Sequence, residues 1–241
     1  MEKKIKSEGK CIFCEKTFAK AGINRHLKTH LTQIVKTGKP GLSYYLKIEQ
    51  DPKWGVAPYF LYLWVSSDMT LDQLDEFLRN IWLDCCGHMS SFNEKKKPMG
   101  FEWNIDDDEY GIKMSKKAKK LFKEGMVLDY EYDFGSSTNL CVTVVEELLT
   151  MAEKPITLLS RNEPLAILCD TCKTEPAVEL CAIHNWGEDY LFCKKCAKKH
   201  AKKCDDFADY SAMPVVNSPR MGICAYEGGT IDLERDKIFS K

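Results

Sequence analysis

The central part of the chain alternates hydrophobic and polar residues over short stretches, which is the period of β-strands. SYYLKIEQ at 43–50 and PYFLYLWVS at 58–66 predict two strands rich in aromatic and β-branched residues. FEWNI at 101–105 predicts a further strand before an acidic turn. MVLDYEYDFG and NLCVTVVEELL, joined by a Gly-Ser-Ser turn, predict a β-hairpin.

Helical periodicity appears in two places. An apolar stripe over residues 71–83 predicts a helix, and Thr70 with Gln73 forms a capping box at its start. SKKAKKLFKEG predicts a second helix, capped by Ser115 and ended by Gly125. Strands and helices are interspersed without the regular alternation of a doubly wound fold. The predicted class is therefore α+β, with a small mixed or antiparallel sheet and two main helices.

Paired cysteines and histidines precede this domain. The spacing Cys-x2-Cys, eleven residues, then His-x3-His would place both histidines one turn apart on a helix. It resembles a two-Cys, two-His zinc finger in which one residue is missing between the two core hydrophobes, Phe18 and Ile23. The expected zinc ligands are Cys11, Cys14, His26 and His30.

Basic residues on this predicted finger suggest contact with nucleic acid. The expected contact residues are Lys16, Lys20, Arg25 and Lys28. Residues 1–40 contain ten Lys/Arg and three Glu, although the whole chain has a net charge of −1. This basic arm is therefore the part that we expect to meet a polyanion. A single finger reads about three base pairs, so a finger that binds protein or caps a domain is the alternative.

A denser cluster runs from Cys169 to Cys204. It contains four pairs of candidate ligands, namely Cys169/Cys172, Cys181/His184, Cys193/Cys196 and His200/Cys204. Such spacing lets one tight turn present two ligands to a tetrahedral zinc ion. We expect alternate pairs to share an ion, so the first and third pairs form one site and the second and fourth form the other.

The helix expected from about residue 194 favours two ions over one, because it places Cys196, His200 and Cys204 on one face over about 12 Å. A single zinc held by the two Cys-x2-Cys pairs, as in zinc ribbons, is the alternative. The alternating arrangement resembles B-box and related cross-brace modules. Four ligands for each ion leave no position for water, so the chain is expected to hold about three structural Zn²⁺ ions.

Several motifs of the central domain occur in a recognisable order. They are the TLDQL start of the helix at Thr70, His88 with Phe92, and YEYDFG at 130–135 ahead of a valine-rich strand. In this order they resemble the plasmid pRiA4b ORF-3-like family, which is also described as passenger proteins of insertion elements. The resemblance implies a fold and a mobile-element setting, but no assigned reaction.

The chain departs from the pattern of this family in two places. After YDFG the family continues with an acidic residue, a tryptophan and a histidine, where this chain has Ser136, Thr138 and Leu140. The family's P-x-x-W-R-R segment before the second strand is replaced by VAPYFLYLWV. If those polar residues form a ligand site in relatives, we expect that site to be depleted here.

Composition and the breaks in the residue pattern predict the cellular compartment and the domain boundaries. Twelve cysteines, in a chain whose first residues lack the apolar core of a signal peptide, favour metal-bound thiolates in a reducing cytoplasm. No apolar run approaches the ~18 residues of a membrane span, so no membrane contact is expected. The predicted organisation is a finger at 1–38, an α+β domain at 40–160, a zinc module at 161–210 and a tail at 211–241 packed on the body.

Candidate catalytic groups are few. His88 follows the pair Cys85-Cys86, but nothing arranges His88, Asp133 and Glu146 as nucleophile, base and orienter. Asp133 at a hairpin turn is expected to bind backbone N–H groups. We therefore expect a non-enzymatic zinc-binding adaptor of mobile-element type that contacts nucleic acid or protein through its zinc modules. A purely protein-binding module, or an enzyme with a site in the central domain, is the alternative.

Overall fold

The computed structural model describes residues 6–51, 58–95, 107–108, 111–184 and 189–231. The chain divides into two compact units. The first, which we call the sheet unit, comprises Ser7–Leu78 and His88–Glu163. The second, the cysteine-rich unit, comprises Met1–Lys6, Arg79–Gly87 and Pro164–Lys241. Residues 7–38 therefore belong to the same unit as the sheet, while the finer domain boundaries given above stay predictions.

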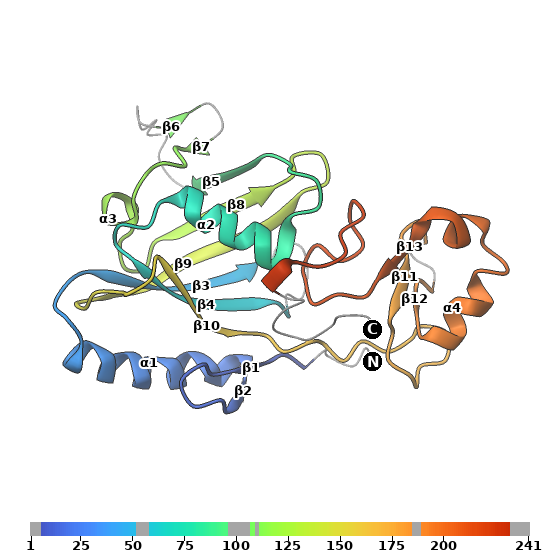
Figure 1. The fold of residues 1–241 in the computed structure, drawn as a ribbon, viewed down its shortest axis with the longest axis horizontal. Helices are drawn as coiled ribbons and strands as arrows, with labels where there is room; N and C mark the ends of the chain where they lie inside the picture. Colours follow the sequence, from blue (N-terminus) through green and yellow to red (C-terminus); the bar gives the residue numbers. More distant parts are fainter. Residues whose placement is uncertain (1–5, 52–57, 96–106, 109–110, 185–188, 232–241) are drawn as a thin grey trace. The chain divides into compact units, whose positions relative to one another are not determined.

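The sheet unit is built on one six-stranded antiparallel sheet (Figure 1). Its strand order is β10-β4-β3-β9-β8-β5. The strands are β3 Ser43–Gln50, β4 Phe60–Ser66, β5 Ser90–Glu94, β8 Val127–Tyr132, β9 Thr138–Leu148 and β10 Ile156–Arg161. The two predicted strands at 43–50 and 58–66 and the predicted hairpin are all present. The α+β class is confirmed.

Two helices lie on opposite faces of this sheet, α1 Lys20–Thr37 on one and α2 Leu71–Leu78 on the other (Figure 1). The predicted capping box of α2 is present, because Thr70 N donates to Gln73 Oε1 at 3.1 Å and Gln73 N to Thr70 Oγ1 at 3.3 Å. Asp75 ties α2 to the sheet, since its Oδ1 accepts a hydrogen bond from the Tyr130 hydroxyl at 2.7 Å.

The second predicted helix is much shorter than expected. α3 spans only Ala118–Leu121, and its N-cap is Lys117 rather than Ser115. The preceding backbone is held by the loop before α2, where Ala118 N donates to Met69 O at 2.8 Å and Leu71 N to Lys116 O at 3.1 Å. Gly125, with φ of +80°, lies in the turn before β8 instead of ending a helix. Tertiary hydrogen bonds therefore replace those of the first helical turn.

Two small hairpins complete the sheet unit. β1 Glu8–Lys10 pairs with β2 Thr17–Ala19, and β6 Asp107–Asp108 pairs with β7 Gly111–Ile112. The strand predicted at 101–105 lies outside the described residues. Of the acidic turn that follows it, only the backbone of β6 is described.

The cysteine-rich unit contains a three-stranded sheet of order β12-β11-β13. Its elements are η2 Arg79–Leu83, β11 Glu179–Cys181, β12 Leu191–Phe192, α4 Lys194–His200, η3 Phe207–Ser211 and β13 Ala212–Pro214. The tail contributes a strand to this sheet at 212–214. Further along, Ser218 Oγ donates to Trp82 O at 2.7 Å, which fastens the tail to η2 within this unit.

The core of the sheet unit beneath α1 is aromatic. Ile23, Leu27 and Leu31 of the helix are buried and pack against sheet residues that include Tyr45 and Tyr62. Within the described ranges, no helix is both long enough and apolar enough to cross a membrane.

Candidate metal centres

The first candidate metal centre lies where the β1–β2 hairpin meets α1. The side chains of Cys11, Cys14, His26 and His30 bring their ligand atoms within 4.8 Å of one another. Cys14 Sγ is 3.1 Å from His26 Nε2, and His26 Nε2 is 3.2 Å from His30 Nε2. Tetrahedral zinc with Zn–N of about 2.0–2.1 Å and Zn–S of about 2.3 Å gives ligand–ligand edges of about 3.3–3.8 Å. Both distances are slightly shorter than these edges, and the four donors have the type and number that a tetrahedral zinc-like cation takes.

A tight turn presents the two cysteines of this centre. Glu15 N donates to Cys11 O at 2.8 Å, Cys11 N donates to Lys16 O at 3.0 Å, and Glu15 has φ of +60°. Burial and the neighbouring His30 lower the pKa of His26, which favours the neutral imidazole that binds a metal.

This metal centre is built into the sheet unit rather than standing beside it. Cys11 belongs to the same hydrophobic cluster as the buried face of α1 and the sheet. Backbone bonds join the hairpin to β10, since Ile12 N donates to Leu159 O at 3.0 Å and Glu163 N to Glu8 O at 2.7 Å. Phe18, one of the two predicted core hydrophobes, is half-buried, and its ring stacks on His26 at 4.0 Å between centroids.

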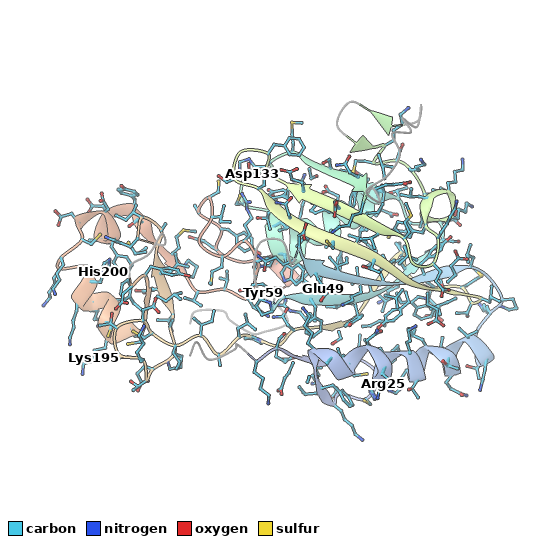
Figure 2. The ribbon with its side chains drawn as sticks, turned by 180° about the vertical axis from the view of Figure 1, so that it is seen from behind. Arg25, Glu49, Tyr59, Asp133, Lys195 and His200 are labelled. Atoms are coloured by element: carbon cyan, nitrogen blue, oxygen red, sulfur yellow. The ribbon has the colours of Figure 1, made fainter. Side chains whose placement is uncertain are left out.

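Two of the four basic residues predicted to contact nucleic acid are ion-paired to the sheet. Lys20 Nζ lies 2.7 Å from Glu49 Oε1, and Lys28 Nζ lies 2.9 Å from Glu146 Oε2. Lys16 and Arg25 are exposed, and Figure 2 shows Arg25 on the side of α1 away from the sheet. The positive charge that this helix offers to a partner is therefore smaller than the sequence suggests.

The second candidate centre consists of four cysteines. Cys169, Cys172, Cys193 and Cys196 place their sulfurs within 4.8 Å of one another. Cys172 Sγ and Cys193 Sγ are 3.9 Å apart, close to the edge of about 3.8 Å for a zinc tetrathiolate. Cys193 caps α4 and Cys196 lies in its first turn. The turn at Cys169 is of the same type as the one at Cys11. Lys173 N donates to Cys169 O at 2.9 Å, and Lys173 has φ of +56°.

The thiols of this centre differ widely in acidity. A hydrogen bond from Thr174, with backbone N–H groups nearby, lowers the pKa of Cys172 to about 6. Burial, with Cys193 and Cys169 beside it, raises the pKa of Cys196 to about 12. Like charges packed together cannot all ionise unless a cation joins them. All four could be thiolates only around a cation, and the group could hold a metal ion in that form.

The third candidate centre combines two cysteines and two histidines: Cys181, His184, His200 and Cys204 have their ligand atoms within 4.8 Å of one another. Cys181 Sγ lies 3.0 Å from His184 Nδ1. The imidazole of His200 is packed between Phe192 and Phe207, with ring centroids 4.4 and 4.9 Å away. Apolar packing of this kind fixes a ligand before the metal arrives.

The ligand pairs of the cysteine-rich unit therefore group alternately in space, the first with the third and the second with the fourth. One detail differs from the expected helix. α4 ends at His200, and a turn follows in which Lys203 N and Cys204 N donate to His200 O at 2.8 and 3.0 Å. This turn brings Cys204 to the same group as His200, while Cys196 belongs to the other group.

The candidate catalytic residues of the sheet unit are not gathered into one site. His88 Nε2 lies 3.5 Å from Asp133 Oδ2. The other oxygen of Asp133 accepts hydrogen bonds from Gly135 N at 3.1 Å and Ser136 N at 3.2 Å, which confirms the predicted turn-capping role. Glu146 is instead paired with Lys28 on α1.

Three further cysteines come together that the sequence does not associate with one another. Cys85, Cys86 and Cys224 belong to the cysteine-rich unit and have their sulfurs within 4.8 Å of one another. Cys85 and Cys86 are 138 or more residues from Cys224 in the chain. No spacing motif could have indicated this contact.

Comparisons with known proteins give little. No family model matches the chain, and no curated protein matches it. Among solved structures, the chain is similar to a crystal structure of a protein of unknown function from Methanosarcina mazei Go1. That match has a TM-score of 0.37 and 21% sequence identity, and it covers 48% of this chain and 67% of the other. A likeness this low supports no functional conclusion.

Proposed function

We propose that this protein is a non-enzymatic zinc-binding adaptor whose metal ions are structural. The observation that supports the proposal is that three separate groups, each of four Cys/His side chains, bring their ligand atoms within 4.8 Å of one another. A zinc ion with four protein ligands has no open position for water or substrate, so it stabilises structure and catalyses nothing. Exclusively sulfur and imidazole donors at tetrahedral spacing favour Zn²⁺ over magnesium, calcium or manganese.

The test of this proposal is the metal content of the full chain. Protein purified with zinc and washed with a weak chelator is expected to keep three zinc ions per chain. Cys169→Ser and Cys181→Ser should each lose one ion if the cysteine-rich unit has two independent sites. Loss of zinc from Cys169→Ser alone would instead support the single-zinc alternative. A zinc content near one in the wild type would contradict the proposal.

The partner is proposed to be a nucleic acid that contacts the lysine-rich face of α4. The supporting observation is a group of six exposed lysines, four in α4 and two in the turn after it. They are Lys194, Lys195, Lys198, Lys199, Lys202 and Lys203. Cys193, Cys196 and Cys204 in the same segment are buried, and Figure 2 labels Lys195 near the start of α4 and His200 at its end. Closely spaced lysines of this kind supply phosphate contacts.

Binding of mixed-sequence DNA and RNA at low and moderate salt tests the choice of partner. The wild type should bind with an affinity that falls as salt rises, because each phosphate contact releases a counterion. Replacing Lys194, Lys195, Lys198 and Lys199 by Gln should abolish this binding. The matched control, Lys16→Gln with Arg25→Gln on α1, should weaken it little. If the wild type binds neither nucleic acid, the nucleic-acid partner is wrong and the protein-binding alternative is the one to test.

Membership of the pRiA4b ORF-3-like family, and with it a mobile-element origin, stays part of this proposal. It is supported by the sequence motifs and by their position on β4, α2, β5 and the β8–β9 hairpin, in the order that the motifs suggest. A catalytic role for the sheet unit is the weaker alternative. The observation that supports it is the His88–Asp133 pair. An enzymatic activity of the wild type that is lost in His88→Ala but kept in Glu146→Gln would favour this alternative.

A further inference from the structure

The cysteine-rich unit contains a cluster of thiols outside the three closed centres. Cys86 Sγ lies 3.7 Å from Cys85 Sγ and 3.7 Å from Cys224 Sγ. Cys85 and Cys86 follow η2, whereas Cys224 belongs to the tail. None of the three belongs to a disulfide, and Cys86 and Cys224 are exposed. This cluster is distinct from the ligand groups described above.

The spacing of these sulfurs is that of a metal site. Thiolates bound to one zinc ion at about 2.3 Å lie about 3.8 Å from each other. Both distances in the cluster are within about 0.1 Å of that edge, as is the Cys172–Cys193 distance in the four-cysteine centre. From these observations we propose that Cys85, Cys86 and Cys224 form a fourth metal site, which binds a thiophilic cation such as Zn²⁺ through three thiolates.

The fold holds the two cysteine-bearing segments together on both sides of the cluster. Ser218 Oγ donates to Trp82 O at 2.7 Å, before the cysteine pair. Gly229 approaches the same segment so closely that a Cβ there would lie 2.3 Å from Asn80 O. Tyr226, two residues beyond Cys224, is fully buried and fixes the tail next to the cluster. The thiols are therefore placed by the packing of the unit before any ion binds.

The backbone at Cys224 is held in an unfavourable conformation. Cys224 and Ala225 both have positive φ, +49° and +52°. Two consecutive residues with side chains seldom adopt this region, because Cβ crowds the backbone. Strain of this kind collects at functional positions. Here the strained residue is the one whose thiol lies 3.7 Å from that of Cys86.

A buried positive charge adjoins the cluster. Arg220 Nη2 donates to Cys85 Sγ at 3.5 Å, and the side chain of Arg220 is fully buried. Three thiolates around a divalent cation carry one net negative charge. The positive charge of the Arg220 guanidinium balances that negative charge. A cluster of neutral thiols would have no negative charge to balance.

The proposed site differs from the closed centres in its access. It offers three protein ligands, two of them exposed, so a water molecule or a further donor completes the coordination. We expect the fourth site to exchange its ion quickly, while the closed centres keep theirs.

The experiment compares the zinc content of variants of the full chain kept under reducing conditions. After saturation with Zn²⁺ and removal of excess, wild type should hold one more ion per chain than Cys224→Ser and Cys86→Ser. A weak chelator should remove that extra ion first and make the three proteins equal. Ser137→Ala, an exposed substitution in the sheet unit outside every candidate ligand group, is the control and should keep the wild-type content.

The proposal is overturned if wild type and both variants bind the same number of ions at saturation. It is also overturned if a Cys86–Cys224 disulfide, which makes the chain two mass units lighter, persists under these reducing conditions at the same zinc concentration. Circular dichroism of the variants shows whether they fold, and Cys86→Ser changes an exposed side chain outside the strained turn. The readout is a difference of one ion, so it stands even if the closed centres bind fewer ions than proposed.

Discussion

At the scale of single residues, two of the candidate metal centres contain a turn of the same type. Four residues after Cys11 and after Cys169, the chain adopts positive φ and donates an N–H to the carbonyl of that cysteine. Neither position is glycine; they are Glu15 and Lys173. The turn brings the second cysteine of each pair, Cys14 or Cys172, beside the first. The Cys-x2-Cys spacing can therefore be recognised from sequence, even though the backbone of its turn has a positive φ at a residue other than glycine.

The ion pair between Lys20 and Glu49 gives a prediction at this scale. Burial opposes the ionisation of Glu49, but its hydrogen bonds with Lys20 and Lys47 outweigh it and lower its pKa. Lys20→Met should therefore lower the free energy of unfolding at pH 7 by about 1 kcal/mol, as for a partly exposed pair. Urea unfolding of Lys20→Met, Glu49→Gln and the double variant measures the coupling.

The matched control is Lys16→Met, which removes the same charge from an exposed position and should change stability little. The pH dependence has a definite sign. Because the pKa of folded Glu49 is lowered, its stabilisation is complete above the ordinary glutamate pKa of about 4.3 and is lost as the pH falls through the lower value. A difference between wild type and Glu49→Gln that grows in acid would contradict this account.

At the scale of elements, α1 has three faces with different surroundings. Ile23, Leu27 and Leu31 recur every four residues and face the sheet, while His26 and His30 face the cysteines of the hairpin. The remaining surface is exposed and carries few charges. A finger that reads DNA needs a free helix face with several side chains that reach bases. α1 is better suited to holding the sheet unit together.

The buried face of α1 supplies the next prediction. Leu27→Ala should lower the free energy of unfolding of the sheet unit by about 2–5 kcal/mol, because it leaves a cavity between the helix and the sheet. Thr29→Ala on the exposed face of the same helix should cost less than about 0.5 kcal/mol. Denaturant unfolding followed by tryptophan fluorescence makes the comparison. Equal effects of the two substitutions would show that α1 does not pack on the sheet in solution.

At the scale of the whole molecule, each compact unit contains its own candidate metal centres. The sheet unit has one closed centre and a large hydrophobic core. Among its described residues the cysteine-rich unit has two such centres, and five of the eight buried residues of one of its hydrophobic clusters are candidate ligand cysteines, so little of that core is independent of the metal. Where the core is small, metal binding supplies much of the folding free energy. The two units should therefore respond differently to loss of a ligand.

Cys193→Ser and Cys11→Ser test this difference. Cys193→Ser should release the zinc of its centre and expose the cysteine-rich unit to proteolysis, while the six-stranded sheet stays folded. Cys11→Ser should release one zinc ion and lower the stability of the sheet unit without unfolding the other unit. Zinc analysis combined with hydrogen exchange of each unit provides the measurement. Unfolding of both units by Cys193→Ser would contradict their independence.

The sequence predicted the features that depend on local spacing. The capping box of α2, the β8–β9 hairpin and the turn-capping role of Asp133 are confirmed, since each is decided within a few residues. The long helix predicted after Ser115 is wrong, because hydrogen bonds to residues 67–71 compete with helix formation. Local propensity cannot anticipate such long-range competition.

The sequence by itself determined the ligand pairs, because a tight turn or one helical turn fixes two donors at a set distance. It also determined the α+β class through the periods of its apolar residues. Only the tertiary structure decided that α1 packs on the sheet, that Lys20 and Lys28 are neutralised there, and that Cys224 lies beside Cys86. Those outcomes depend on contacts between residues far apart in the chain, and no periodicity or spacing encodes them.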